Sequence, residues 1–370
     1  MNLYYSTCPA GMEKLLVKLA PHTIRGFSMK RTMPGAILYT AAALTPNCGG
    51  FHNTYLVLDQ IPRSRHLAFA AQRFAENRQL MHAVDQTLYR RKIRSVRVMF
   101  MEDNRLASVK GDLRAQLERP IRAAKIERET PDSELVVLQR PEGMALLLLR
   151  LTRGENTRHQ LDKNELPAQL CWCMVAMAHP RRGGVFLDPF AGSGALTQAR
   201  AQFAPAKSML SFDLDGEKVR QMKKRLPEAA CVERQDAFTL DERLEKGSVT
   251  ELVTDPVDAF SERRPTQYYL DMLRVFGYLL APGARLVVLV EDGAHFESAL
   301  RLSEAFVLRE RYDFRAGQRH MTLYGCGRSA EPTANCYRGG QAKLGAIDQN
   351  PQFLRGWENN VLPHKASRSY

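Results

Sequence analysis

Three features are scarce in this sequence of 370 residues: long apolar runs, a leader-like start and paired cysteines. No stretch approaches the roughly 18 consecutive apolar residues that a membrane-spanning helix needs, so no membrane partner is expected. Residues 1–10 contain no basic segment followed by an apolar run, so no secretory signal can be read there. We therefore expect a cytoplasmic protein.

Cysteine is present, but its arrangement favours neither disulfides nor metal. The 7 cysteines are an odd number and are spread over the whole length. Only Cys171 and Cys173 are close together, and their single-residue spacer differs from the two residues that separate ligands in common zinc sites. Reduced thiols and no metal are expected.

Acidic residues are under-represented in the N-terminal part, and this gives the chain most of its net charge of +13. Residues 1–150 contain 23 Lys and Arg against 13 Asp and Glu, whereas residues 151–370 contain 30 against 27. A basic group placed on a phosphate releases condensed counterions, so nucleic acid is the expected partner. An inert, solvated basic surface is the alternative.

The N-terminal part resembles two small α+β units in its pattern, which we place at residues 1–60 and 61–155. In the first, strand-like segments surround an amphipathic helix at Gly11–Ala20. The second begins with a mostly helical segment. The strands expected in the two units are Leu3–Thr7, Ala36–Thr40, Val96–Phe100, Glu134–Leu138 and Ala145–Leu151. A basic helix is expected at Arg105–Ala124.

Strands and helices alternate through residues 156–326. A bridging helix is expected at Asn164–Met177 and precedes the first strand. Expected strands lie at residues 185–187, 208–212, 251–253, 284–290, 306–312 and 320–325. This alternation implies an α/β domain with a mostly parallel, Rossmann-like sheet and helices on both faces. Residues 327–370 show no hydrophobic period, and we interpret them as a tail of uncertain order.

The strongest motif is the segment LDPFAGSGAL, which starts at Leu187. A strand runs into a glycine turn that opens a helix, and glycines allow the backbone to turn tightly and approach a ligand. Such a turn lies at the carboxyl edge of a parallel sheet, where α/β folds bind ligands. A dinucleotide-binding loop is the alternative, but that fingerprint needs G-x-G-x-x-G, and only Gly192-Ser193-Gly194 is present.

Acidic residues follow the next strands of this domain. Asp213 ends the second strand, about twenty residues after the glycine loop, and can accept hydrogen bonds from ribose hydroxyls. Asp236 follows the third strand and can pair with an adenine amino group. Asp255 follows the fourth strand and is joined to Pro256. We interpret Asp215 as a surface or helix-capping acid.

This order resembles the class I S-adenosylmethionine-dependent methyltransferase family across residues 164–326. The resemblance implies S-adenosyl-L-methionine as the cofactor, with the glycine loop beside its methionine part. The implied cofactor-binding residues are Asp188, Pro189, Phe190, Gly192, Ser193, Gly194, Asp213, Asp236 and Ala237. The pattern D-P-F-x-G-S-G looks like the subgroup that methylates exocyclic amines of nucleic-acid bases.

In those relatives the fourth strand ends in Asn or Asp, Pro, Pro and an aromatic residue. The acid and the first proline carbonyl accept the two amine hydrogens, and the aromatic ring stacks on the base, so catalysis is by positioning. Here Asp255 and Pro256 match, Val257 and Asp258 depart from the pattern, and Phe260 is the candidate stacking ring. The departure leaves a catalytically weak or silent RNA-binding relative as an alternative.

The N-terminal half resembles the ferredoxin-like and THUMP domains of RNA methyltransferases, on residues 4–13 and 90–153. The resemblance implies RNA as the partner, tRNA held at its acceptor stem, and N2-methylguanosine as the product. Candidate RNA contacts are Arg90, Arg91, Lys92, Lys110 and Arg114. A DNA amine methyltransferase is a further alternative, against which the separate basic N-terminal region argues. The oligomeric state is left open.

Overall fold

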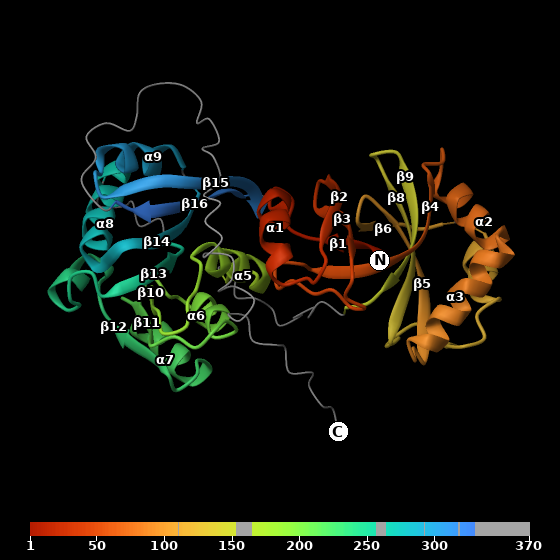
Figure 1. Cartoon of the computed structure of the whole chain (residues 1–370), viewed down its shortest axis with the longest axis horizontal. Coiled ribbons are helices and arrows are strands. Elements are labelled where there is room, and N and C mark those ends of the chain that lie inside the picture. The colour runs from red at the N-terminus through yellow and green to blue at the C-terminus, as the bar shows by residue number, and fades with distance from the viewer. Residues whose placement is uncertain (110, 153–164, 257–263, 292, 317–318, 330–370) are drawn as a thin grey trace. The chain divides into compact units, whose positions relative to one another are not determined.

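The computed structural model describes residues 1–109, 111–152, 165–256, 264–291, 293–316 and 319–329. Its contacts divide the chain into two compact units, Met1–His159 and Gln160–Tyr370, which we call unit 1 and unit 2 (Figure 1). None of the helices in the described ranges has the length and apolar character needed to cross a membrane.

Unit 1 is built on one mixed sheet, with nine strands among its described residues. The strands are β1 (Asn2–Thr7), β2 (Ser28–Met33), β3 (Ala36–Ala41), β4 (Asn53–Pro62), β5 (Ser95–Glu102), β6 (Arg105–Leu106), β7 (Lys125–Ile126), β8 (Ser133–Arg140) and β9 (Met144–Arg150). Their order is β2-β3-β1-β4-β9-β8-β5-β6, with β7 beside β5. Because β4 pairs with both β1 and β9, residues 1–60 and 61–155 contribute to the same sheet. Their separation into two domains stays a prediction.

Short helices complete unit 1. They are α1 (Glu13–Leu19), η1 (Ala20–His22), α2 (Leu67–Glu76), α3 (Arg78–Arg90) and α4 (Leu113–Glu118). On α2, the buried side chains of Leu67, Ala70, Ala71 and Phe74 recur at helical spacing, so one stripe of the helix faces the core. Figure 1 shows α2 and α3 together at one side of this unit.

The basic helix predicted at Arg105–Ala124 is wrong. Asp103 and Asn104 have φ angles of 47° and 63°, and this turn pairs β5 with β6 as a hairpin. Gly111 has a φ of 91°, and the chain becomes helical only after it. Pro120 lies two residues past the end of α4, where it cannot continue the helix. Only six residues are therefore α-helical here.

Unit 2 contains a sheet of seven strands among its described residues, in the order β12-β11-β10-β13-β14-β16-β15. The strands are β10 (Val185–Asp188), β11 (Ser208–Asp213), β12 (Ala230–Arg234), β13 (Val249–Thr254), β14 (Leu280–Val290), β15 (Phe306–Ala316) and β16 (Arg319–Arg328). The strands from β10 to β14 run parallel, and β16 runs antiparallel to β14 and β15. The predicted Rossmann-like α/β fold is confirmed.

Helices cover both faces of this sheet (Figure 1). They are α5 (Ala168–Met177), α6 (Ala195–Arg200), α7 (Gly216–Arg225), η2 (Ala237–Glu242), α8 (Pro265–Leu279) and α9 (Gly293–Leu302). On β14, Leu286, Val288 and Val290 share a core cluster with residues of α8 and α9. The alternate residues Val287 and Leu289 are just as buried and point to the opposite face.

Candidate active site

The motif residues of unit 2 gather at one edge of its sheet. Strand β10 lies between β11 and β13, and all three run parallel, so their carboxyl ends meet at the same edge. Asp188 and Asp213 are the last residues of β10 and β11, and Asp255 directly follows β13. Neighbouring strands are about 4.8 Å apart, so three carboxyl groups stand on adjacent strands where α/β folds bind ligands.

The turn between β10 and α6 is shaped by two glycines. Gly192 and Gly194 have φ angles of 54° and 81°, in the left-handed region that favours glycine. A Cβ atom on Gly194 would lie 2.9 Å from Cδ1 of Leu226, so this glycine is packed against a side chain. At Gly192, no atom of the described residues lies within 4 Å of the Cβ position. The backbone of Gly192 therefore borders open space that a ligand can enter.

Asp213 is tied to the backbone of the glycine loop. Its Oδ2 accepts a hydrogen bond from the Gly192 N–H at 2.8 Å, and its Oδ1 accepts one from the Asp215 N–H at 2.9 Å. The Phe212 carbonyl accepts another from the Ala191 N–H at 2.8 Å. Each carboxylate oxygen retains capacity for a second donor, such as a ribose hydroxyl. Asp213, the residue predicted to bind the ribose, thus lies directly beside the glycine loop.

Asp188 is a buried carboxyl group at the start of this loop. Its Oδ1 accepts a hydrogen bond from Thr254 Oγ1 at 3.1 Å and a longer one from the Phe190 N–H at 3.4 Å. Its Oδ2 is buried and has no hydrogen-bond partner among the described residues. Burial is the largest cause that raises the pKa of Asp188 to about 8, and the charges of Asp255 and Asp213 raise it further. At neutral pH this carboxyl is therefore mostly protonated.

Asp236 stands after β12, as predicted for the adenine-binding acid. It caps η2, because its Oδ1 accepts a hydrogen bond from the Phe238 N–H at 2.9 Å. Ala237 is buried next to it, and the Phe238 ring meets the Phe190 ring edge to face with centroids 6.2 Å apart. Pro189, the other predicted loop residue, is buried. The acid after β12 and the loop after β10 are thus joined through aromatic packing.

The predicted catalytic residues are described only in part. Asp255 is half-buried and Pro256 is buried, both directly after β13. The effect of Asp255 on the Asp188 carboxyl places the two acids within electrostatic reach of each other. Val257, Asp258 and Phe260 lie outside the described residues. Their part in the site stays a prediction.

The described residues offer little for metal or thiol chemistry. They contain no group of three or more His, Cys, Asp or Glu that could hold a metal ion. The described cysteines are free, and burial raises the pKa of the Cys171 thiol, which lies near Asp188. A protonated, buried thiol is a poor nucleophile.

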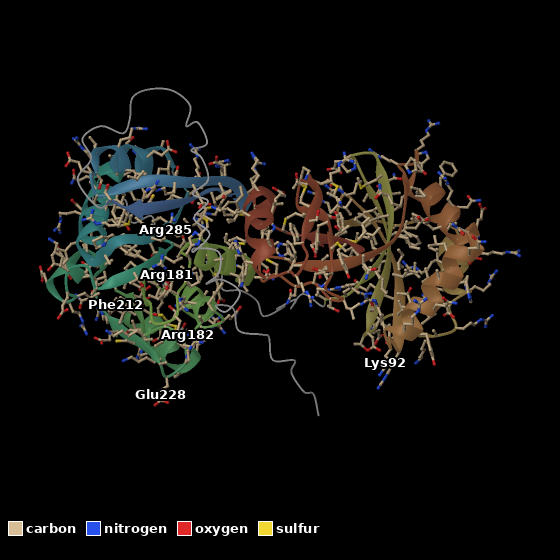
Figure 2. All side chains as sticks on the ribbon, in the orientation of Figure 1. Lys92, Arg181, Arg182, Phe212, Glu228 and Arg285 are labelled. Atoms are coloured by element: carbon tan, nitrogen blue, oxygen red, sulfur yellow. The ribbon has the colours of Figure 1, made fainter. Side chains whose placement is uncertain are left out.

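Three of the predicted RNA contacts stand together at the end of α3. Arg90 is exposed and donates a hydrogen bond to Gln86 at 3.0 Å, and Arg91 donates one to the Leu44 carbonyl at 3.2 Å. Lys92 is exposed with a φ of 56°, and Figure 2 shows it at the periphery of unit 1. These three side chains present positive charge to solvent on one small surface.

The remaining candidates are more scattered. Arg114 is exposed on α4, with its guanidinium 5.8 Å from the centroid of the Phe100 ring. Lys110 lies outside the described residues. Arg97 belongs to the same basic stretch of sequence as the end of α3, but its charge is already paired with Glu134 inside unit 1.

Two residues of the site were not predicted from the sequence. Thr254 ends β13 and donates the hydrogen bond that joins this strand to Asp188. Glu165 accepts a hydrogen bond from Ser193 Oγ at 3.2 Å and forms an ion pair with Arg225. The position of Thr254 next to Asp255 was the available signal, whereas Glu165 belongs to no recognisable motif.

Comparison with protein families identifies the type of domain. Residues 155–321 match the family described as "RMKL-like, methyltransferase domain". Unit 2 therefore carries a methyltransferase domain, and the predicted cofactor of such a domain, S-adenosyl-L-methionine, is confirmed. A search of curated protein sequences gave no significant match.

Solved structures share the fold of both units. TrmN from Thermus thermophilus matches with a TM-score of 0.68 and 18% identity, covering 89% of this chain and 100% of that one. SMU.472, a predicted methyltransferase in complex with SAH, matches with a TM-score of 0.59 and 12% identity, covering 88% of this chain and 97% of that one. A predicted N6-adenine-specific DNA methylase from Listeria monocytogenes matches with a TM-score of 0.56 and 13% identity, covering 88% of this chain and 95% of that one. At these identities the likeness shows the fold.

The residues present fit the cofactor. Gly192 borders open space, and Asp213 has acceptor capacity beside it. Oδ2 of Asp188 is a buried polar atom that finds no partner within the described part of the chain, as expected of a site that is completed by a ligand.

Proposed function

We propose that this chain, whose residues 155–321 match an RMKL-like methyltransferase domain, is an RNA methyltransferase that modifies the exocyclic N2 of a guanosine in tRNA. The observation that carries the proposal is the meeting of the glycine loop, Asp213 and Asp255 at one edge of a parallel sheet. When bound, S-adenosyl-L-methionine supplies an electrophilic methyl group.

The cofactor would be held by residues that follow three neighbouring strands. The backbone of Gly192–Gly194 would border the methionine part, Asp213 would accept hydrogen bonds from the ribose, and Asp236 would accept one from the adenine amine. The hydrogen bond from Gly192 to Asp213 keeps the first two groups in a fixed relation. Binding geometry of this kind contributes to rate by orientation.

The target amine would be held by Asp255 and Pro256. The lone pair of an amine on an aromatic base is delocalised into the ring, so the nitrogen is a weak nucleophile. Two acceptors, the Asp255 carboxylate and the Pro256 carbonyl, bind the two N–H groups and turn the lone pair toward the methyl group. Phe260 is proposed to stack on the base. Because β13 lies beside β10, these acceptors are one strand away from the glycine loop.

Three observations support RNA, and specifically the acceptor stem of tRNA, as the substrate. The excess of basic residues lies in residues 1–150, and Arg90, Arg91 and Lys92 expose charge on unit 1. The N-terminal sequence resembles ferredoxin-like and THUMP domains. TrmN shares the fold over most of the chain. Phosphate contacts from unit 1 would position the RNA without reading its sequence.

The proposal is tested by incubating the protein with labelled S-adenosyl-L-methionine and unmodified total tRNA, followed by nucleoside analysis. Label is expected in N2-methylguanosine. Asp255→Ala should lower the rate by at least about 100-fold, because the amine loses its acceptor, while the affinity for S-adenosylhomocysteine changes by less than about 3-fold. Glu228→Ala is the matched control, since Glu228 is an exposed acid at the periphery of unit 2 (Figure 2).

The departure at Val257 and Asp258 favours one alternative, a silent RNA-binding relative. Binding of both S-adenosylhomocysteine and tRNA without methyl transfer would support it, and restoring Pro and Tyr at these positions should then create activity. Duplex DNA added as a competitor tests the other alternative. If DNA accepts label and tRNA does not, the proposed substrate is wrong.

A further inference from the structure

Glu165 lies between the glycine loop and the end of α7. Its Oε1 accepts a hydrogen bond from Ser193 Oγ at 3.2 Å, and its carboxylate forms an ion pair with Arg225. The Glu165 side chain is only 9% exposed, whereas that of Arg225 is 41% exposed. A carboxylate so far removed from water needs partners, and Oε1 of Glu165 has two, Ser193 and Arg225.

The end of α7 supports the glycine loop at two points. Helix α7 begins at its cap Asp215, confirming the capping role predicted for that acid. At the other end, Leu226 packs on Gly194 and joins a buried cluster that includes Ala191. Arg225, the preceding residue, reaches the same loop through Glu165. The end of α7 thus contacts the loop directly at Gly194, through Leu226, and indirectly at Ser193, through Glu165.

The hydrogen bond between Ser193 and Glu165 has a chemical direction. An ionised carboxylate has no hydrogen to donate, so the Ser193 hydroxyl must donate its single hydrogen to Glu165. The lone pairs of Ser193 Oγ then remain as acceptors. A ligand group that binds this oxygen must itself be a donor, as an ammonium group is.

We propose that Glu165 is a positioning residue that fixes Ser193 as a hydrogen-bond acceptor for the α-ammonium group of the cofactor. The inference rests on the proposed function and names the part of S-adenosyl-L-methionine that this subsite binds. Glu165 acts through Ser193, and Arg225 in turn holds the Glu165 carboxylate in place.

The test compares two ligands by calorimetric titration. S-adenosylhomocysteine carries the ammonium group, whereas 5′-methylthioadenosine has the same adenine and ribose but lacks the amino-acid part. Glu165→Ala should lower the affinity for S-adenosylhomocysteine roughly tenfold, which is the loss expected for one charge-assisted hydrogen bond. It should change the affinity for 5′-methylthioadenosine by less than about 2-fold. Ser193→Ala should have the same effect. The double variant Glu165→Ala/Ser193→Ala should bind S-adenosylhomocysteine no more weakly than the weaker-binding single variant.

Two further variants separate positioning from a structural role. Glu165→Gln keeps an oxygen that can accept from Ser193 but loses the charge, so it should recover part of the affinity for S-adenosylhomocysteine. Arg220→Ala is the matched control, because Arg220 is an exposed arginine of α7 whose partner is Glu217 on the same helix. It should leave both affinities unchanged.

The outcomes discriminate between the proposals. If Glu165→Ala weakens both ligands equally, or lowers the melting temperature while the ratio of the two affinities stays constant, the residue is structural and the inference is overturned. If the unaltered protein binds neither ligand, the inference fails, because the subsite that it names does not bind the cofactor. If it binds S-adenosylhomocysteine but does not methylate tRNA, only the proposed reaction fails, and the affinity ratio still decides the role of Glu165.

Discussion

The two units use their sheets in different ways. In unit 2 the parallel strands bring residues that are far apart in sequence to one edge, where Asp188, Asp213 and Asp255 stand on adjacent strands. In unit 1 most strand pairs are antiparallel, and three of the candidate RNA contacts lie at the end of α3 rather than along a sheet edge. Methyl transfer needs groups fixed within a few ångströms, whereas phosphate binding tolerates a more open surface.

The units also differ in how they treat buried charge. In unit 2, Arg200 and Glu251 form an ion pair whose side chains are only 1% and 2% exposed. In unit 1, Arg140 is equally buried, but its partners Asp103 and Glu142 are 58% and 18% exposed. A pair that is wholly removed from water depends on both members, while a pair open to water can lose one at lower cost.

Removal of Arg200 should have the largest effect on stability. Its Nε lies 2.6 Å from Glu251, and its other nitrogens donate to the carbonyls of Ala204 and Arg181. Arg200→Met would leave Glu251 buried without its cation, so the free energy of unfolding should fall by about 3–5 kcal/mol. Denaturant titration measures this.

The variant of unit 1 to compare with Arg200→Met is Arg97→Met, which removes the more exposed arginine of the ion pair with Glu134. Arg97 is 34% exposed, and Arg150 still pairs with Glu134 after its removal, so a loss of about 1 kcal/mol is expected. Equal losses for the two variants would contradict the difference drawn between the units.

Asp188 should make the stability of unit 2 depend on pH. Its pKa is about 8 in the folded protein, well above the ordinary value of 3.8, so the folded state holds a proton that the unfolded state has released. Stability from this group is fully present below pH 4 and is lost as the pH rises through 8, by about 1.4 kcal/mol per pH unit between these limits.

Asp188→Asn removes this titration. The melting temperature of the variant, relative to the unaltered protein, should therefore rise between pH 6 and pH 9. Circular dichroism melts at one-unit intervals measure the difference. A constant difference across this range would show that the folded carboxyl ionises at its ordinary pKa.

The two loop glycines should separate cofactor binding from folding. Gly192→Ala places a methyl group in open space at a φ of 54°, so it should cost about 1 kcal/mol of stability. Because that space is expected to hold the cofactor, the affinity for S-adenosylhomocysteine should fall about tenfold or more. Gly194→Ala adds a clash with Leu226 and should cost more stability, about 2 kcal/mol. Thermal melts and calorimetry on both variants test this order. A larger loss of stability for Gly192→Ala would refute it.

Local pattern was enough to predict much of unit 2. Buried apolar runs predicted its strands, and the sequence pattern correctly placed Asp213 at the end of β11 and Asp236 just after β12. Their part in binding the cofactor stays a prediction. The helix expected from Asn164 begins only at Ala168, directly after Pro167. Contacts over long separations gave no signal: Ser193 and Glu165 are 28 residues apart, and Thr254 and Asp188 are 66 apart.

The wrong helix in unit 1 has a related cause. Basic residues at helical spacing suggested one helix over Arg105–Ala124, but the left-handed turn at Asp103 and Asn104 starts a hairpin instead. Strand β4 runs across residue 60, because it pairs Tyr55 with Tyr5, 50 residues earlier, and with Arg150, 95 residues later. Tertiary pairing overrides such local preferences.

The smallest effect is expected at the charged end of α3, and it tests whether unit 1 acts by phosphate contact. In the variant Arg90→Gln/Lys92→Gln, each lost contact should lower the slope of log affinity for tRNA against log salt by about 1, with an affinity loss of only about 5-fold at moderate salt. Affinity for S-adenosylhomocysteine should stay constant. Arg78→Gln, at the opposite end of the same helix, is the control. If the slope stays the same in the double variant, the RNA contacts lie elsewhere, and the contrast between a fixed catalytic edge and a charged binding surface would have to be drawn with other residues.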